Sequence, residues 1–288
     1  MPEVKIVTDS TADIPVELTK ALDITVIPLK VSMGSDTYQD GVSLTPDEFY
    51  NKLETLDDLP TTSQPSPYEF ETVYERIARK SDGKPADILS IHISSRMSGT
   101  VQSAEVAAAS IGENINVKVI DSKRASYAIG VIVVEIAKMA RDGAGLAQCE
   151  ARLEQLLEET NVYFLVDTLQ YLQKNGRIGK ASALIGSLLK MKPVLSLNKD
   201  GEVYPYQKAR GKKKAMQAIS EALQKEYKER PVHIGVSHAR APEAGEELLK
   251  SAKETLNVKS DVLTKIGAVI GSHTGPGTIA VAVMPAEE

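Results

Sequence analysis

Short apolar runs alternate with amphipathic helical patterns along this chain of 288 residues, and that alternation restricts the fold more than any other feature. In the first half, residues 4–8, 88–93 and 117–120 have the composition of buried strands, and helical spacing separates them. Strands that alternate with helices predict a parallel or mostly parallel sheet that is covered on both faces. We therefore expect an α/β fold.

The second half of the chain has a different pattern, with a strand at 162–166 and a hairpin at 194–206. A chain of this length favours two domains of ordinary size. We expect the boundary in the helical stretch 147–161 or at its end. The resulting division is an N-terminal α/β subdomain, 1–155, and a C-terminal α/β subdomain, 156–288, each built on a mostly parallel sheet.

Composition narrows the functional classes. The net charge of -5 gives no indication of a nucleic-acid partner. The single cysteine, Cys149, excludes an intramolecular disulfide and suits a reducing cytosol. The N-terminus lacks the apolar core of a signal peptide, and no apolar stretch approaches the ~18 residues that span a bilayer. We expect a cytoplasmic protein without stable membrane insertion.

Metal ligands are not expected, because the sequence contains no H-E-x-x-H motif, no EF-hand loop and no cysteine pair. The acids Asp9 and Asp13 resemble a weak metal or general-acid pair. The interpretation that we favour for them is capping of the helix that begins near Pro15.

Three predicted strands end in turns that carry hydroxyl groups: T-D-S-T at 8–11, H-I-S-S at 92–95 and D-S-K at 121–123. In open α/β sheets, ligands bind outside the carboxyl ends of the strands, so these turns form one candidate region. The turn after residue 93 contains neither G-x-S-x-G nor a Walker phosphate loop. It offers hydroxyls and backbone N–H groups to an anion, but the turn taken alone favours helix capping by Ser98 or Ser95 over ligand binding.

Two further segments have the composition of binding loops. Residues 61–65, T-T-S-Q-P, supply hydroxyls and an amide on a backbone stiffened by prolines. Residues 271–277, G-S-H-T-G-P-G, place one histidine in a glycine-rich loop that allows close backbone approach. A plain surface loop and a structural histidine remain the alternatives when each segment is taken alone.

A basic run, K-A-R-G-K-K-K, occupies residues 208–214. A solvated surface is the default interpretation of such a run. Its lysines lie at the start of a predicted helix, against the helix dipole, so a docking patch for an acidic or phosphate-bearing partner is the second interpretation. Arg177, in N-G-R-I-G, could belong to the same surface.

Six motifs together give the chain a specific resemblance, which spans nearly its whole length. They are V-T-D-S-T-A-D-I-P, T-T-S-Q-P-S-P, I-S-S-R-M-S-G-T-V-Q-S-A, V-I-D-S-K, K-N-G-R-I-G and G-S-H-T-G-P-G, in that order. The chain resembles the DegV family, the bacterial fatty-acid-binding proteins that present acyl chains to a fatty acid kinase. The resemblance implies two α/β subdomains with a lipid buried between them.

The resemblance also implies which residues bind the carboxyl group and which face the kinase. For the carboxyl group it points to Thr62, with Ser63 as a possible neighbour, to Ser94 or Ser95, and to His273. For docking of the kinase subunit it points to Arg177 and Arg210. No cofactor is implied, because the bound fatty acid is the ligand and the kinase supplies the nucleotide chemistry.

The implied function is that of a lipid carrier without its own enzymatic activity, which binds a long-chain fatty acid such as palmitate and presents its carboxylate for phosphorylation. A chain of ~14 methylenes at ~0.8 kcal/mol each contributes on the order of 11 kcal/mol before the cost of association, so the tail sets affinity. We expect apolar helices near 129–136 and 184–191 to line the pocket. The alternative is an enzyme, a hydrolase or kinase subunit, that acts on a small substrate through His273, because the fold also resembles the substrate-binding subunit of dihydroxyacetone kinases.

Overall fold

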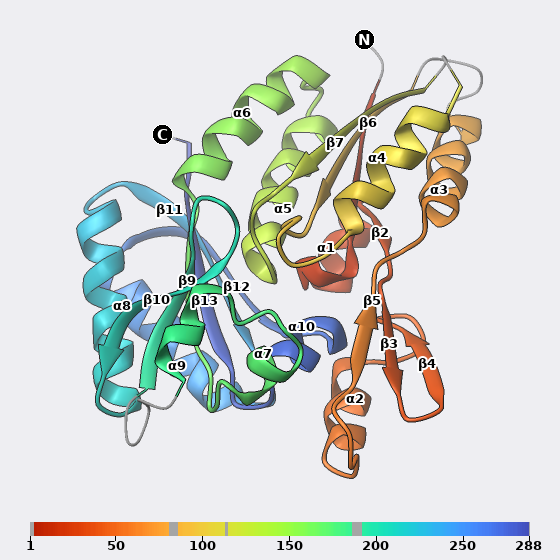
Figure 1. The fold of residues 1–288 in the computed structure, drawn as a ribbon. Helices are drawn as coiled ribbons and strands as arrows, with labels where there is room; N and C mark the ends of the chain where they lie inside the picture. The colour runs from red at the N-terminus through yellow and green to blue at the C-terminus, as the bar shows by residue number, and fades with distance from the viewer. Residues whose placement is uncertain (1–2, 81–85, 113–114, 186–191, 288) are drawn as a thin grey trace.

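The computed structural model describes residues 3–80, 86–112, 115–185 and 192–287. Its first sheet has the strand order β2-β1-β6-β7, and every pair in it is parallel, as expected. The strands are β1 (Val4–Asp9), β2 (Thr25–Ile27), β6 (Ala86–His92) and β7 (Ile115–Asp121). The surrounding helices are η1 (Ser10–Ala12), α1 (Val16–Ala21), α3 (Pro67–Lys80), α4 (Thr100–Ser110) and α5 (Tyr127–Arg141). Helices α3 and α4 cover one face of the sheet and α5 covers the other (Figure 1).

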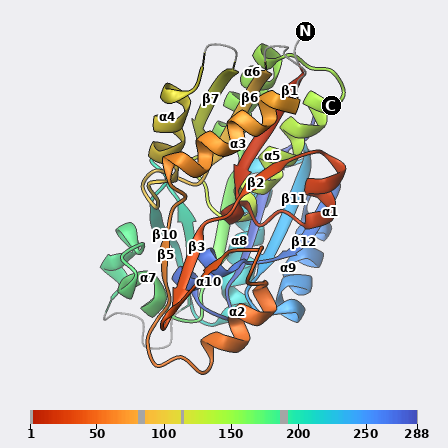
Figure 2. The same ribbon diagram turned by 90° about the vertical axis from the view of Figure 1, so that its right-hand side faces the viewer.

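A small antiparallel sheet, order β4-β3-β5, projects from the first half together with a helix (Figure 2). Its elements are β3 (Lys30–Met33), β4 (Asp36–Gln39), β5 (Thr61–Ser63) and α2 (Pro46–Leu53). The extended run at 24–33 is therefore not one strand. Pro28, which has no N–H group, lies between β2 in the first sheet and β3 in the small one. Residues 61–63, expected as part of a loop, pair with β3.

The second half forms a sheet of order β10-β9-β8-β13-β11-β12. Its strands are β8 (Asn161–Leu165), β9 (Lys192–Leu197), β10 (Val203–Ala209), β11 (Pro231–His238), β12 (Asn257–Lys265) and β13 (Ile279–Pro285). Only β11 and β12 pair in parallel, so the α/β class is confirmed but this sheet is mixed, not mostly parallel as expected. The reason is topological: β13 starts where β11 ends, with Ile279 opposite His238, and must run back along it.

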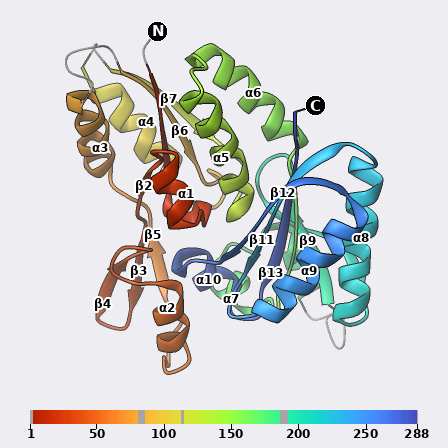
Figure 3. The ribbon, with the colours of Figure 1, turned by 180° about the vertical axis from the view of Figure 1, so that it is seen from behind.

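Helices α8 (Lys212–Tyr227) and α9 (Pro242–Thr255) cover one face of the second sheet. The other face meets the short helices α7 (Gln170–Lys174) and η2 (Gly179–Leu184), and also α5 and α6 (Leu146–Glu159) from the first half. Helix α10 (Ala268–Thr274) lies between this sheet and the small sheet (Figure 3). Among the described residues, no helix is long and apolar enough to cross a membrane.

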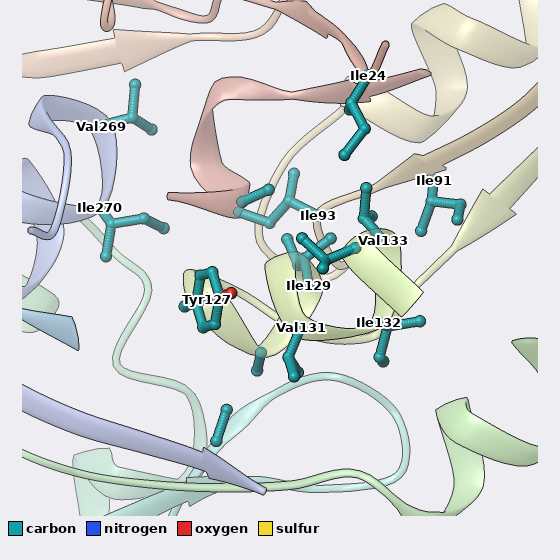
Figure 4. Packing of buried hydrophobic residues seen from close by; sticks show 14 of the residues in the cluster. Ile24, Ile91, Ile93, Tyr127, Ile129, Val131, Ile132, Val133, Val269 and Ile270 are labelled. Atoms are coloured by element: carbon teal, nitrogen blue, oxygen red, sulfur yellow. The ribbon is translucent and has the colours of Figure 1, made fainter. Parts of the chain in front are cut away.

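Helix α5 joins the two halves into one core. It packs against β1 and β6 of the first sheet and against β11 and β13 of the second. Residues from Tyr127 to Val134 are buried without interruption, as expected for a helix that is apolar on all sides. Figure 4 shows Tyr127, Ile129 and Val133 of this helix among apolar side chains of both halves. The proposed division at 155/156 falls inside α6, between the last strand of the first sheet and the first strand of the second.

Candidate functional site

A pocket lies between the two halves of the molecule and contains about 860 Å³ of empty space, counted out to its open mouth. Most of its wall is apolar, and both halves contribute. Leu29, Ile93 and Met97 come from the first half, and Phe164, Leu197 and Val269 from the second. Such a wall suits a ligand with a large apolar surface.

A polar cluster interrupts the apolar wall where β5 meets α10. Thr62 Oγ1 and His273 Nε2 lie 2.8 Å apart and form a hydrogen bond, and both residues line the pocket. Ser63 and Gln64 line it beside Thr62. The other ring nitrogen, His273 Nδ1, is buried and has no hydrogen-bond partner among the described residues.

His273 is neutral at physiological pH. Burial lowers the pKa of its imidazole from 6.5 to about 4, and the positive charge of Arg177 acts in the same direction. A neutral ring carries one N–H donor and one acceptor nitrogen. With the proton on Nε2, the ring donates to Thr62 Oγ1 and leaves the threonine hydroxyl free to donate to a ligand; with the proton on Nδ1, the Thr62 hydroxyl donates to Nε2 instead.

The glycine-rich segment that carries His273 is helical over residues 271–274 and forms a turn at residues 276–277, and its glycines serve the expected close approach. A Cβ atom on Gly271 would lie 2.5 Å from the Tyr50 hydroxyl oxygen. One on Gly275 would lie 2.4 Å from the Tyr171 ring, and Gly275 also has φ +76°. Only glycine at both positions lets α10 pack this closely between α2 and α7.

Ser94 and Ser95 are not brought to the pocket. Ser94 is fully buried, and its hydroxyl donates to the carbonyl oxygen of Gly201 at 2.9 Å. The Ser95 hydroxyl donates to Asp121 Oδ2 at 2.5 Å, at an exposed position. The geometry gives no support for the expected carboxyl contact of either serine. Ser98, which we considered only as a helix cap, lines the pocket instead.

Arg177 lines the pocket, a role that the sequence did not indicate. Its guanidinium donates to the carbonyl oxygens of Met97 and Asn175 at 3.1 and 2.7 Å. Arg210 follows the far end of β10, about 20 Å along the strand from Val203, the pocket residue at its near end. The structure thus brings Arg177, but not Arg210, to the site.

The two acids of the first turn do not cap α1, which begins after Pro15 without a side-chain cap. Asp9 instead accepts hydrogen bonds from the backbone N–H of Ile93 and from His92 Nδ1, both at 3.0 Å. Asp13 accepts one from the N–H of Gly267, at the start of α10. The prediction that they cap the helix near Pro15 was therefore wrong, although Asp9 also accepts the N–H of Thr11 at 3.0 Å and so caps η1.

The expected helical lining is also wrong for residues 129–136, which are absent from the pocket wall because α5 is enclosed in the shared core. Leu184 is buried in another cluster, and residues 186–191 lie outside the described part of the chain. The apolar wall comes mainly from strand ends and the segments after them, such as Val162, Val203 and Ala280. No groups of three or more acidic, histidine or cysteine side chains that could hold a metal ion occur among the described residues.

Known proteins resemble this chain in sequence and in architecture over nearly their full length. A family model described as "Uncharacterised protein, DegV family COG1307" matches residues 3–286. Protein DegV of Bacillus subtilis is 35% identical over 280 residues, which cover 96% of this chain and 98% of that protein.

Among solved structures, one described as fatty acid binding of a DegV family protein from Thermus thermophilus superposes with a TM-score of 0.92. It is 37% identical and covers 99% of this chain and 100% of that one. A stearic-acid-binding protein from Eubacterium ventriosum gives a TM-score of 0.88 at 29% identity, with 99% and 98% covered. On the family match and the sequence identity over nearly the full length, the chain belongs to the DegV family.

Proposed function

We propose that this chain binds a long-chain fatty acid such as palmitate, with the acyl tail in the apolar pocket and the carboxylate at Thr62 and His273. The observation that carries the proposal is the hydrogen-bonded pair of Thr62 and His273 on an otherwise apolar wall. The relatives described as fatty-acid-binding proteins support the same ligand class.

The geometry supports an acid over an apolar ligand without a head group. An apolar wall stabilises the tail at ~0.8 kcal/mol per buried methylene. The Thr62 hydroxyl, which His273 Nε2 orients, and the hydroxyls of Ser63 and Ser98 on the same wall supply hydrogen-bond donors for a carboxylate. The charge of Arg177, close enough to lower the pKa of His273, favours an anion in the same place.

We further propose that the bound carboxylate is presented to a partner kinase, so that this chain carries the acyl group and the partner phosphorylates it. Arg177 at the pocket and Arg210 in the basic run 208–214 are the proposed docking residues for that partner. Ser94 and Ser95 would serve by shaping the turn that places Ser98. Replacement of Arg210 by glutamate is expected to weaken the association with the kinase and to leave palmitate binding unchanged.

Binding of palmitate and of hexadecanol to the delipidated protein tests the first proposal. The two ligands have the same number of carbon atoms and differ in the head group, so the ratio of their dissociation constants isolates the carboxylate contact. We expect both to bind, with palmitate the tighter. Native mass spectrometry of the purified protein is expected to show a co-purified fatty acid. A protein that is purified without a bound fatty acid and then binds neither palmitate nor hexadecanol would contradict the proposal.

A further inference from the structure

Helix α10, which carries His273, is too short to be stable by itself. It has seven residues, and isolated helices of that length do not persist in water. Its first residues leave backbone N–H groups without intrahelical acceptors, and the N-cap, Gly267, has no side chain to supply one. The position of His273 therefore depends on groups from elsewhere in the molecule that hold this helix.

Two buried acids from the first half supply those groups. Asp13 Oδ1 accepts the N–H of Gly267 at 2.8 Å, and Asp40 Oδ1 accepts the N–H of Ala268 at 2.9 Å. Asp13 Oδ2 also accepts the hydroxyl of Ser126, a pocket residue, at 2.5 Å. A Cβ atom on Gly267 would lie 2.9 Å from Asp13 Oδ1 and 3.2 Å from Asp40 Oδ1, so glycine is required for both acids to reach the helix.

The small sheet β4-β3-β5 and the residue directly after β4 contact both ends of α10. Asp40 directly follows β4, and Thr62 lies on β5 of the same small sheet, where it bonds His273 in the last turn of the helix. A seven-residue helix is only about 10 Å long. A displacement at its N-terminus is therefore transmitted directly to the histidine ring.

We infer that Asp13 and Asp40 are positioning residues for the carboxylate site: by anchoring the start of α10 they set the distance between His273 and Thr62 and so determine the preference for an acid. This inference rests on the proposed function. Burial raises the pKa of Asp40 to about 6 and also raises that of Asp13, with the nearby charge of Asp40 adding to the shift of Asp13. What each residue must provide is an acceptor oxygen, which an asparagine also has.

The test compares the dissociation constants of palmitate and hexadecanol for the wild type, Asp40→Ala, Asp40→Asn and a control, Asp47→Ala. Asp47 is an exposed acid of α2 that pairs with Lys265 at 2.6 Å, close to α10 but without a contact to its N–H groups. We expect the ratio of the hexadecanol dissociation constant to the palmitate dissociation constant to fall at least tenfold in Asp40→Ala. In Asp40→Asn and Asp47→Ala this ratio should stay within twofold of wild type. Equal losses for both ligands, or an unchanged ratio in Asp40→Ala, would overturn the inference.

Gly267→Ala provides a second variant if Asp40→Ala does not fold. Its added methyl group displaces both acids without removing any hydrogen-bonding side chain. We expect it to lower the same ratio and to change the ¹⁵N chemical shift of His273 Nε2, a readout that general destabilisation would not move. A wild-type ratio in Gly267→Ala contradicts the inference. A wild-type protein without any preference for palmitate contradicts the proposed function itself, so the two failures are distinguishable.

Discussion

Thr62→Val tests the carboxylate site with the smallest change in shape. Valine keeps the volume and β-branching of threonine, so β5 and the apolar wall are retained, but the hydroxyl 2.8 Å from His273 Nε2 is lost. Under the proposal this removes one partner from a network that binds a charged group. Hydrogen bonds to charged groups contribute about 1.5–3 kcal/mol, and neutral ones about 0.5–1.5 kcal/mol.

Those magnitudes predict a specific pattern of affinities. Palmitate should bind about 10- to 150-fold more weakly to Thr62→Val, and hexadecanol only about 2- to 12-fold more weakly. Isothermal titration calorimetry on delipidated protein measures both. The free energy of unfolding should also fall by about 1–3 kcal/mol, because Nε2 of the buried His273 loses its partner.

Thr61→Val is the matched control, since Thr61 is the exposed neighbour in β5 and does not line the pocket. It should leave both affinities within about twofold of wild type, the scatter of a surface substitution within ±0.5 kcal/mol. If Thr62→Val binds palmitate as tightly as Thr61→Val does, or if palmitate and hexadecanol lose affinity equally, the reasoning is refuted.

Three further predictions follow from the same geometry. The pKa of His273 in the folded state lies near 4, below its usual 6.5. The free energy of unfolding is therefore highest above pH 6.5, and it falls between pH 6.5 and 4 because only the unfolded state takes up the proton there. Urea unfolding at pH 7 and 4.5 should show wild type losing about 2 kcal/mol more than His273→Asn, and equal losses would count against a buried neutral ring. Bound palmitate places an anion beside the ring, so NMR titration should show the pKa of His273 rising on binding, and no rise would argue against the carboxylate contact. Gly275→Ala should lower the free energy of unfolding by about 1–3 kcal/mol more than Gly41→Ala does. Gly41 also has a positive φ, but no atom lies within 4 Å of the added Cβ. Similar losses in the two variants would show that contact with the Tyr171 ring does not require glycine.

Local sequence pattern predicted most of the fold. Alternating apolar strands and helical spacing predicted the parallel first sheet and the class of the second half. They did not predict where β13 inserts, because the direction of a strand depends on which end of the sheet the chain reaches first. The pattern around Pro28 also concealed a change of sheet, since β2 and β3 have the same composition.

The site could be predicted only in part. The proline-stiffened loop 61–65, the glycine-rich histidine segment and the family resemblance indicated Thr62 and His273, which the fold brings together. The roles of Ser94 and Ser98 could not be separated, because residues four apart in one turn differ only in which way they point. Nothing in the sequence indicated a role for Asp40 at the site. A single acid after a short strand is common, and its hydrogen-bond partner Ala268 is distant in sequence.

A crystal structure of the protein with bound palmitate tests the central claim most directly. We expect the acyl chain inside the apolar pocket, with a carboxylate oxygen about 2.6–3.2 Å from Thr62 Oγ1. A carboxylate at the opposite end of the pocket, or a palmitate molecule bound elsewhere on the protein, would contradict it.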